Sequence, residues 1–258
     1  MTGLSDGPEP APGTLRAWEL LHEAAGRRAL GWRRLAEAFY HPDGQWTQDL
    51  LAGLIEQDLA HSVAWLDSDQ ELFDKPLASL RRFSEAQAEL DLEAVHEALE
   101  VEYARLFIGP ARELPAQPYE SVWLDNDPQS GQRLFGGAST TAVEASYSQH
   151  GLVRVRSHHD LPDHIATEQE FLCYLCEREA EAWSKGDSRA AKELRAAEQE
   201  FLTTHLGRFA PQFCAAINEA APDGAYAAFA AYLLAFLTIE SGTPYVEIVG
   251  SIWPTAGP

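Results

Sequence analysis

Hydrophobic residues recur every three or four positions over most of the chain, which is the spacing of one buried face of an α-helix. In the first such stretch Leu15, Trp18 and Leu21 follow Thr14, a residue suited to a helix N-cap, and the sequence HPDG at 41–44 is a helix stop. Short polar or glycine-containing segments separate the later patterns. The predicted helices cover about residues 14–40, 47–66, 76–90, 92–107, 141–150, 162–184, 187–206, 208–220 and 223–240.

This pattern predicts an all-α fold. We expect a single helical domain over residues 14–258, made of two packed lobes, and a disordered tail over residues 1–13. The segments 105–135 and 150–162 do not continue the helical pattern and are the expected joints between the two lobes.

The stretch RLFIGPARELPAQPYESVWLD (105–125) is predicted to be a long loop without helix, because three prolines and a glycine interrupt it. Leu106 and Phe107 at one end, and Val122 and Trp123 at the other, would anchor it to the core. One interpretation is a rigid structural crossover between helices. The other is a binding segment, because long irregular segments are uncommon in compact domains unless they bind something.

Two helix starts are predicted from capping residues. Thr141, followed by Glu144 three residues later, forms a capping-box pattern. At the start of the long helix in the second half, Asp160 is the expected N-cap, Pro162 lies in the first turn and Asp163 at the third helical position. Both aspartates are thereby explained as parts of a helix N-terminus.

His164 and Glu168 lie one turn apart on the apolar stripe of that helix, so we expect a partly buried polar pair. Together with His158 and His159 they allow an alternative interpretation, a metal-dependent helical-bundle enzyme with nitrogen and oxygen ligands for zinc or iron. The sequence has no HExxH motif and no paired ExxH segments of the kind found in carboxylate-bridged iron bundles. No cofactor is therefore expected, and there is no phosphate-binding motif for a nucleotide.

Cysteine usage and hydropathy bear on the compartment. Cys173 and Cys176 form a C-x-x-C inside a strong helical pattern, which favours core packing over redox or zinc chemistry. Three cysteines do not make a disulfide framework, and the first residues lack a cationic start followed by an apolar run, so a cytoplasmic protein is predicted. The longest apolar stretch, 225–239, is shorter than the about 20 residues needed to cross a bilayer. We expect it to be a buried helix, without stable membrane insertion.

The formal net charge of −21 argues against nucleic acid as a partner, because clustered lysines and arginines are needed to neutralise phosphates. It favours a basic partner, or else it is an acidic surface that keeps the protein soluble. The four arginines between residues 27 and 34 have glutamates nearby on the same helix, so they are expected on a solvent-exposed face.

Three motifs occur in order along the middle of the chain: YARLFIGP (103–110), PYESVWLD (118–125) and LPDHIATEQEFLCYL (161–175). On these motifs the chain resembles the TorD/DmsD/NarJ family of cytoplasmic chaperones, which assist the assembly of molybdenum-containing oxidoreductases. The resemblance covers about residues 95–180, and Glu120 stands where some relatives have a small residue.

The resemblance implies an all-helical chaperone, not an enzyme. Its partner would be the twin-arginine signal peptide, and the apo form, of the catalytic subunit of a molybdenum oxidoreductase, held back from export until the cofactor is inserted. A monomer or a domain-swapped dimer is compatible with it. As signal-peptide-binding residues it implies Gly109, Pro110, Ser121, Trp123, Asp163 and His164, and the neighbouring motif residues Leu106, Phe107, Tyr119, Pro162 and Glu168 complete the predicted site.

A twin-arginine signal peptide presents two adjacent guanidinium groups and then an apolar run of about 7 to 15 residues. A receptor for it needs carboxylates beside a hydrophobic groove. Here the groove is expected at Leu106, Phe107, Val122 and Trp123, with the loop prolines holding the backbone in the binding conformation. The predicted carboxylates around it are Glu102, Glu113, Glu120, Asp125 and Asp127, joined by Asp163 and Glu168 from the second lobe.

Overall fold

The computed structural model describes residues 12–66, 68–109, 114–125, 134–153 and 160–242. Within them the chain is helical, with one isolated antiparallel bridge between Tyr119 and His164 and no named strand. The all-α prediction is confirmed. The helices are α1 (Pro12–Phe39), α2 (Gly44–Leu51), α3 (Leu54–Ser62), α4 (Glu71–Gln87), α5 (Leu92–Phe107), α6 (Glu120–Leu124), α7 (Ala138–Gln149), α8 (Ile165–Ser184), α9 (Ser188–Thr204), α10 (Leu206–Ala220) and α11 (Ala225–Ser241).

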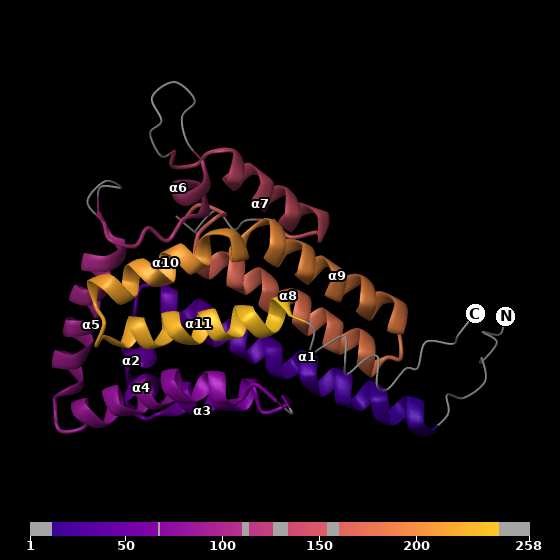
Figure 1. The fold of residues 1–258 in the computed structure, drawn as a ribbon, viewed down its shortest axis with the longest axis horizontal. Coiled ribbons are helices and arrows are strands. Elements are labelled where there is room, and N and C mark those ends of the chain that lie inside the picture. Colours follow the sequence, from indigo (N-terminus) through magenta and orange to yellow (C-terminus); the bar gives the residue numbers. More distant parts are fainter. Residues whose placement is uncertain (1–11, 67, 110–113, 126–133, 154–159, 243–258) are drawn as a thin grey trace.

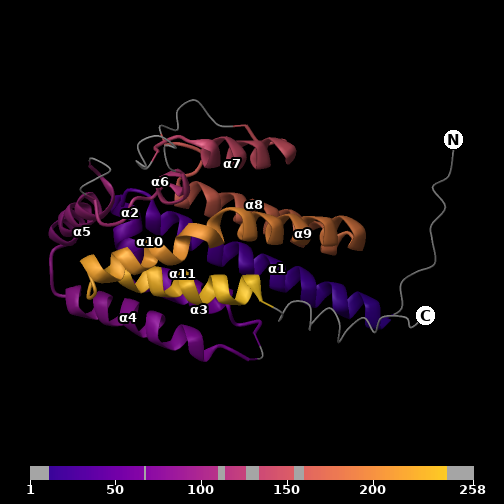
Figure 2. The ribbon, with the colours of Figure 1, turned by 45° about the horizontal axis from the view of Figure 1, so that its top comes forward.

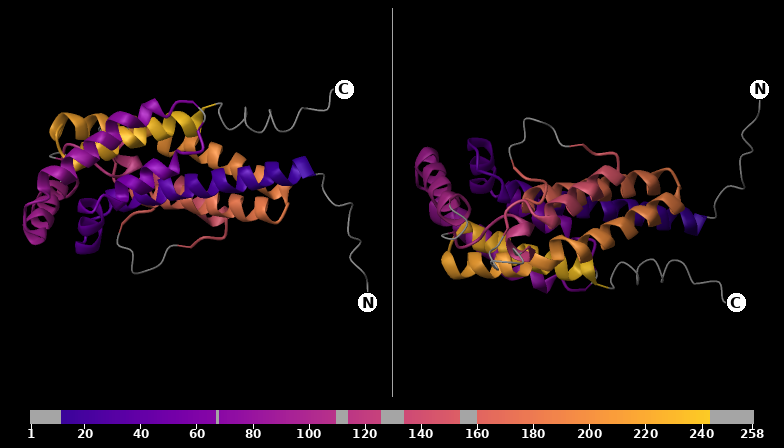
Figure 3. Two further views of the ribbon diagram at one scale, coloured as in Figure 1. Left: turned by 90° about the horizontal axis from the view of Figure 1, so that it is seen from below. Right: turned by 90° about the horizontal axis from the view of Figure 1, so that it is seen from above.

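The long helices lie side by side. α1 packs along α8 in the most extensive helix contact of the described residues, and α8 packs in turn against α9 (Figures 1 and 3). α11 lies between α4 and α10 and contacts both. α7 lies outside α8 and α9 at one edge of the molecule, and α6 is the element it contacts most (Figure 2).

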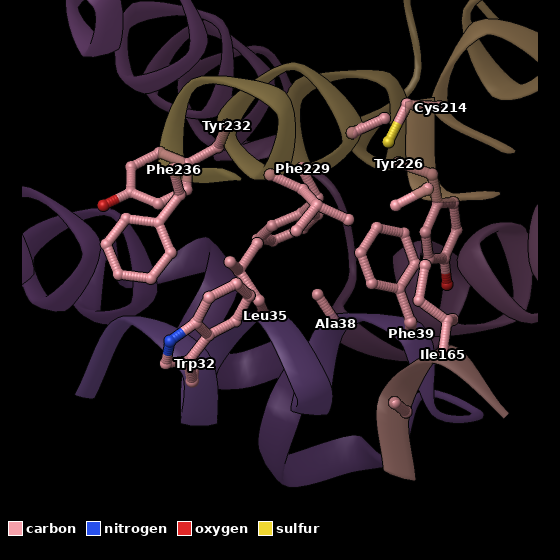
Figure 4. Packing of buried hydrophobic residues seen from close by; sticks show 14 of the residues in the cluster. Trp32, Leu35, Ala38, Phe39, Ile165, Cys214, Tyr226, Phe229, Tyr232 and Phe236 are labelled. Atoms are coloured by element: carbon pink, nitrogen blue, oxygen red, sulfur yellow. The ribbon is translucent and has the colours of Figure 1, made fainter. Parts of the chain in front are cut away.

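The core lies where α1, α5, α10 and α11 meet (Figure 4). Trp32 of α1 packs edge-on against Phe236 of α11, with ring centroids 4.8 Å apart. Phe39, at the end of α1, packs against Phe213 of α10 and Phe107 of α5. α11 is buried over most of its surface, as its continuous apolar sequence predicts. In the part of the chain that the structure describes, no helix is both long enough and apolar enough to cross a membrane.

Several predicted boundaries were wrong. The helix predicted over 76–90 begins earlier, at Glu71, with Pro76 inside it, and ends at Gln87. The helix predicted over 47–66 is two helices, because Gly53 adopts a left-handed conformation (φ 72°) between α2 and α3. α7 begins at Ala138 after Gly137, so Thr141 and Glu144 lie inside a helix and form no capping box. The stretch 105–125 is not free of helix, since α6 covers its last residues. The predicted tail, 1–13, lies outside the described residues except for the two that begin α1.

The arginines of α1 do not form one exposed face, contrary to the sequence prediction. Arg28 is completely buried, and its guanidinium donates hydrogen bonds to Glu179 of α8 (2.7 Å), to both carboxylate oxygens of Glu240 of α11 (2.9 Å) and to Glu198 of α9. Arg195 donates to Glu198 and Glu240 from the other side. Four helices are thereby joined by two cations and three carboxylates.

The three carboxylates of this network are not equivalent. Burial raises the pKa of Glu198 to about 7, although Arg28 and Arg195 oppose the rise. For Glu240, burial also raises the pKa, but the two arginines outweigh it and the pKa lies below its ordinary value. Protonation of Glu198 removes one negative charge from the network.

This difference predicts a pH dependence of stability. The pKa of Glu198 is about 7 in the folded protein and about 4.3 in an unfolded chain, so its stabilising contribution is complete below about pH 4 and is lost as pH rises through 7. Replacing Glu198 with Gln, which has the shape of the protonated acid, should flatten the fall in unfolding free energy between pH 5 and 8. Chemical unfolding at a series of pH values measures it.

The matched control is Glu193→Gln, also on α9 but on an exposed side chain paired with Arg189. It should keep the wild-type pH profile. An equal slope in Glu198→Gln and in the wild type would contradict the assignment.

Candidate functional site

The second and third sequence motifs meet through their backbones. Residues 118–121 and 163–165 run antiparallel, and we call this contact the backbone bridge. The Glu120 N–H donates to the Asp163 carbonyl (2.9 Å), and the Ile165 N–H donates to the Pro118 carbonyl (2.7 Å). The bridge fixes the segment after α5 to the start of α8, so residues more than forty positions apart in the sequence share one site.

Asp163 supports the bridge with its side chain. Its carboxylate is fully buried and accepts a hydrogen bond from the Ser121 N–H (2.9 Å), while the Ser121 hydroxyl accepts one from the Gly136 N–H (3.2 Å). The prediction that Asp160 caps α8, with Asp163 at its third position, was wrong. The N-cap is His164, whose ring Nδ1 accepts from the Ala166 N–H (3.2 Å). Residues 161–164 form a turn, and the bridge holds His164 itself in an extended conformation, so the helix begins only at Ile165.

On one side of the backbone bridge lies a stack of aromatic rings. The His164 ring is stacked on Tyr40 of α1 (centroids 5.7 Å apart) and meets Tyr119 edge-on (5.1 Å). Phe135 packs edge-on against Tyr119 and is 58% exposed. The Tyr119 hydroxyl donates to Asp160 (3.0 Å). Two of the predicted binding residues, Tyr119 and His164, are therefore in direct contact.

Other predicted site residues support this region from beneath. Leu106 and Phe107 are buried in the core, where the Phe107 ring stacks on Phe213 of α10. Trp123 is half-buried, and its indole N–H donates to the Gln117 carbonyl (2.8 Å). The Pro162 carbonyl accepts from the Tyr147 hydroxyl of α7 (2.9 Å).

The remaining predicted residues lie elsewhere. Gly109 is exposed at the end of the segment after α5, and Glu102 lies against Gly224 at the start of α11. The Asp125 carboxylate accepts from the backbone N–H and the hydroxyl of Ser139 (both 2.8 Å), at the start of α7. Pro110, Glu113, Asp127, His158 and His159 lie outside the described residues.

On the other side of the backbone bridge is a cleft with a volume of about 570 Å³, here called the α7–α9 cleft. Phe171 of α8 and Phe201 of α9 form its floor with ring centroids 4.8 Å apart, and His150 and His205 extend the aromatic contacts toward its two ends. α7 contributes a wall of small side chains. The cleft is lined by Glu120, Asp125, Ala138, Ser139, Ala142, Ala145, Ser146, Gln149, His150, Phe171, Ala197, Glu200, Phe201, Thr204, His205 and Arg208.

One end of the cleft is acidic, and its carboxylates are almost completely buried. Glu120 lines it and is only 1% exposed, and its Oε2 lies 3.0 Å from Nδ1 of His205. Glu168 lies behind Glu120 and is 0% exposed. Burial, and then the negative charges of Glu120 and Asp163, raise the pKa of Glu168 well above its ordinary value, so Glu168 keeps its proton to a higher pH than an exposed glutamate does. The expected partial burial of Glu168 is thus complete.

The described residues give no support to the metal-dependent alternative. They contain no group of three or more His, Cys, Asp or Glu side chains that could hold a metal ion. His164 uses a ring nitrogen as a helix cap and packs its faces on aromatic rings. Cys173 and Cys176 are buried in α8 as free thiols, as the core-packing interpretation predicts, and burial raises the pKa of both.

Sequence reasoning missed the residues that make the cleft. His205 and Phe201 lie at the break between α9 and α10, and the signal for them was a histidine and an aromatic one turn apart at the end of a predicted helix. Ala138, Ala142 and Ala145 recur at helical spacing on α7, which predicts a smooth helix face but not what lies opposite.

The described residues form an all-α fold with an aromatic cleft that is acidic at one end. Residues 66–215 match the model of the nitrate reductase delta subunit family, and the chain belongs to that family. The resemblance inferred from the three motifs is thereby confirmed.

Two relatives are named as chaperones. The chain is 40% identical to the selenate reductase assembly chaperone protein of Thauera selenatis over 70 residues, which are 27% of this chain and 34% of that protein. It is 23% identical to the chaperone protein TorD of Aliivibrio salmonicida (strain LFI1238) over 209 residues, which are 80% of this chain and 92% of TorD. The crystal structure of a redox enzyme maturation protein from Archaeoglobus fulgidus aligns with a TM-score of 0.46 at 21% identity, covering 84% of this chain and 94% of that one. By its family and relatives the protein is a chaperone rather than an enzyme.

The hydrogen bond from Ser121 to Asp163 can be tested by mutation. In Asp163→Ala the buried Ser121 N–H loses its acceptor, which should lower the unfolding free energy by about 1–3 kcal/mol. Asp163→Asn keeps an acceptor oxygen, so its loss should be clearly smaller. Urea unfolding monitored by circular dichroism measures both, and equal losses in the two variants would show that the hydrogen bond is not what matters.

Proposed function

We propose that this protein is a cytoplasmic chaperone that binds the twin-arginine signal peptide of a molybdenum oxidoreductase catalytic subunit in the α7–α9 cleft. It holds the apo subunit in this way until the cofactor has been inserted. The observation that carries the proposal is the cleft itself, with an acidic end beside the backbone bridge and an aromatic floor, in a chain whose relatives are named assembly chaperones.

The chemistry of the cleft matches the order of groups in such a peptide. Two guanidinium groups are followed by an apolar run of about 7 to 15 residues. Glu120 supplies negative charge at one end of the cleft, and Phe171 and Phe201 supply an apolar floor from there onward. The alanines of α7 leave room opposite the floor, so an extended or helical apolar segment has contacts on two sides.

The two kinds of contact have different roles. Burial of apolar surface contributes about 25 cal/mol per Å² removed from water, less the cost of ordering the peptide, so the floor and the α7 wall supply most of the affinity. The charges set the direction in which the peptide lies and raise the association rate, in a chain with a net charge of −21. The backbone bridge supports both by fixing Glu120 relative to α8.

Filling the cleft tests this function. Ala142 is an exposed residue of α7 that lines the cleft, and Ala142→Trp should place an indole where the apolar run lies. The affinity for a fluorescent peptide with two adjacent arginines and an apolar run of about twelve residues should fall by about tenfold or more, equivalent to about 1.4 kcal/mol. Fluorescence anisotropy measures it, with circular dichroism to confirm that the helices are intact.

The matched control is Thr141→Trp, at the neighbouring exposed position that does not line the cleft. It should bind as the wild type does. If both variants bind like the wild type, the peptide lies elsewhere. If the wild-type protein does not distinguish this peptide from one in which both arginines are replaced by glutamine, the proposed twin-arginine recognition is wrong.

A further inference from the structure

The acidic end of the α7–α9 cleft holds three carboxylates without a protein cation. Glu120, Asp163 and Glu168 are 1%, 0% and 0% exposed. In the part of the chain that the structure describes, no lysine or arginine forms an ion pair with any of them. The basic group in contact with the cluster is the His205 ring, whose Nδ1 lies 3.0 Å from Oε2 of Glu120. Buried carboxylates are costly unless they are paired, protonated or fully hydrogen-bonded.

The other buried acidic cluster of the molecule shows the contrast. Glu179, Glu198 and Glu240 are also three buried carboxylates, and one of them comes from the same helix, α8, as Glu168. There Arg28 and Arg195 supply guanidinium donors to all three. Among the described residues, one buried acidic cluster is thus balanced by arginines and the cluster at the cleft is not; Arg208 lines the cleft but forms no ion pair with these three carboxylates.

The unbalanced cluster also lacks hydrogen-bond donors. Neither carboxyl oxygen of Glu168 accepts a hydrogen bond from another described group, and the same holds for Oδ1 of Asp163. Burial and the neighbouring charges of Glu120 and Asp163 raise the pKa of Glu168 well above its ordinary value, so Glu168 is the carboxyl of this cluster that keeps its proton. Buried oxygens without donors, behind a carboxylate that lines an open cleft, are the counterpart of a ligand rich in N–H groups.

We propose that the Glu120 end of the α7–α9 cleft is the receiving point for one guanidinium group of the bound peptide, and that binding expels the proton held by Glu168 behind Glu120. This inference rests on the proposed function, and it names Glu120 as the residue that recognises an arginine of the peptide. Guanidinium has five N–H donors in a rigid fork that matches a carboxylate with two parallel hydrogen bonds. The Glu120 carboxylate accepts two hydrogen bonds from the guanidinium, and Glu168 behind it gains a positive charge nearby.

The proton balance follows from the groups around Glu168. They are Glu120 of α6, Asp163 before α8 and Tyr147 of α7, with Tyr40 of α1 close to Tyr147, and His205 from the α9–α10 junction on the far side of Glu120. None of them is a lysine or an arginine. The raised pKa of Glu168 keeps its proton in place while the cleft is empty, and an arriving cation lowers that pKa, so one proton goes to solvent. Affinity therefore rises with pH.

The test is a double-mutant cycle between Glu120→Gln and the arginines of the peptide, using the same synthetic peptide and a version in which each arginine in turn is glutamine. With the wild type, replacing the arginine that reaches Glu120 should weaken binding by about ten- to hundredfold, the range of a hydrogen-bonded charge pair. With Glu120→Gln the intact peptide should bind about that much more weakly, and replacing the same arginine should then change little.

The control variant is Glu219→Gln, which removes one carboxylate from an exposed position on α10 outside the cleft. It should keep the wild-type dependence on both arginines. If the arginine replacement costs the same factor in Glu120→Gln as in the wild type, Glu120 is not the receiving residue.

A second measurement covers the case in which Glu120→Gln fails to fold. Glu168→Gln has the shape of the protonated acid and should fold, and calorimetric titration in buffers of different ionisation enthalpy counts the protons released on binding. At pH 7 the wild type should release close to one proton per peptide and Glu168→Gln close to none. Equal release in both overturns the inference.

The proposed function and the role of Glu120 are contradicted by different outcomes. A wild-type protein that ignores both arginines, or does not bind the peptide at all, removes the proposed function. A wild-type protein that requires an arginine, while Glu120→Gln keeps that requirement and Glu168→Gln keeps the proton release, removes only the inference about Glu120.

Discussion

The buried guanidinium of Arg28 is the interaction on which the arrangement of the long helices depends. It joins α1 to α8, α9 and α11 at one point, and each of its carboxylate partners loses its main cation if Arg28 is removed. Apolar contacts between helices tolerate sliding by a turn, whereas a set of directed hydrogen bonds between four helices has one register. Because α8 and α9 carry the floor of the α7–α9 cleft, the spacing of Phe171 and Phe201 is set by a network that lies well away from them.

The backbone bridge adds the second constraint, at the other end of α8. Phe107, the last residue of α5, is packed in the core, and the segment after it has to connect α5 to the start of α7 at Ala138. Pairing with residues 163–165 satisfies the backbone groups of that segment without a sheet, and the buried carboxylate of Asp163 takes one N–H more. The prolines of the segment restrict its unfolded conformations, so the bridge forms at a smaller entropic cost. The same pairing brings Tyr119 to His164 on one side and Glu120 to the cleft on the other.

The sequence predicts what is local and misses what depends on distant partners. Helical periodicity was sufficient for the all-α class and for the buried α11, and the three motifs were sufficient for the family. Arg28 shows the limit. It shares the helix face of Leu21, Trp32 and Leu35, so its burial could have been read from the pattern, but its partners are 151, 170 and 212 positions away and no local rule connects them.

The same limit applies to the site. Tyr119, Ser121, Asp163 and His164 were named for one site on the resemblance of their motifs, and the structure brings them into contact, while their role in binding stays a prediction. The predicted hydrophobic groove depended on assigning Phe107 to a surface, and periodicity does not tell a core face from a binding face. The cleft that the structure does show takes Glu120, Asp125 and Phe171 from the motifs, but most of its lining comes from α7, α9 and His205, which lie outside them. An open space between helices leaves no mark in the sequence of either helix.

The cost of the uncompensated carboxylates is itself an argument about specificity. Apolar residues at the positions of Glu120 and Glu168 would pack without any ionisable group, and replacing buried charges by apolar groups of similar volume is often neutral or stabilising. Keeping the acids leaves the empty cleft at a higher free energy than it needs to have, and on the proposed function a guanidinium would relieve that cost while an apolar peptide alone would not. A peptide without the arginine would leave the buried carboxylates unpaired, and an unsatisfied buried carboxylate costs more than a hydrogen bond at the surface is worth. On the proposed function, this penalty contributes to discrimination as much as the contacts of the correct peptide do. On the proposed function, release of the client has a further consequence: when the arginine withdraws, the proton returns to Glu168, and the charge pair that oriented the peptide is lost while the apolar contacts remain.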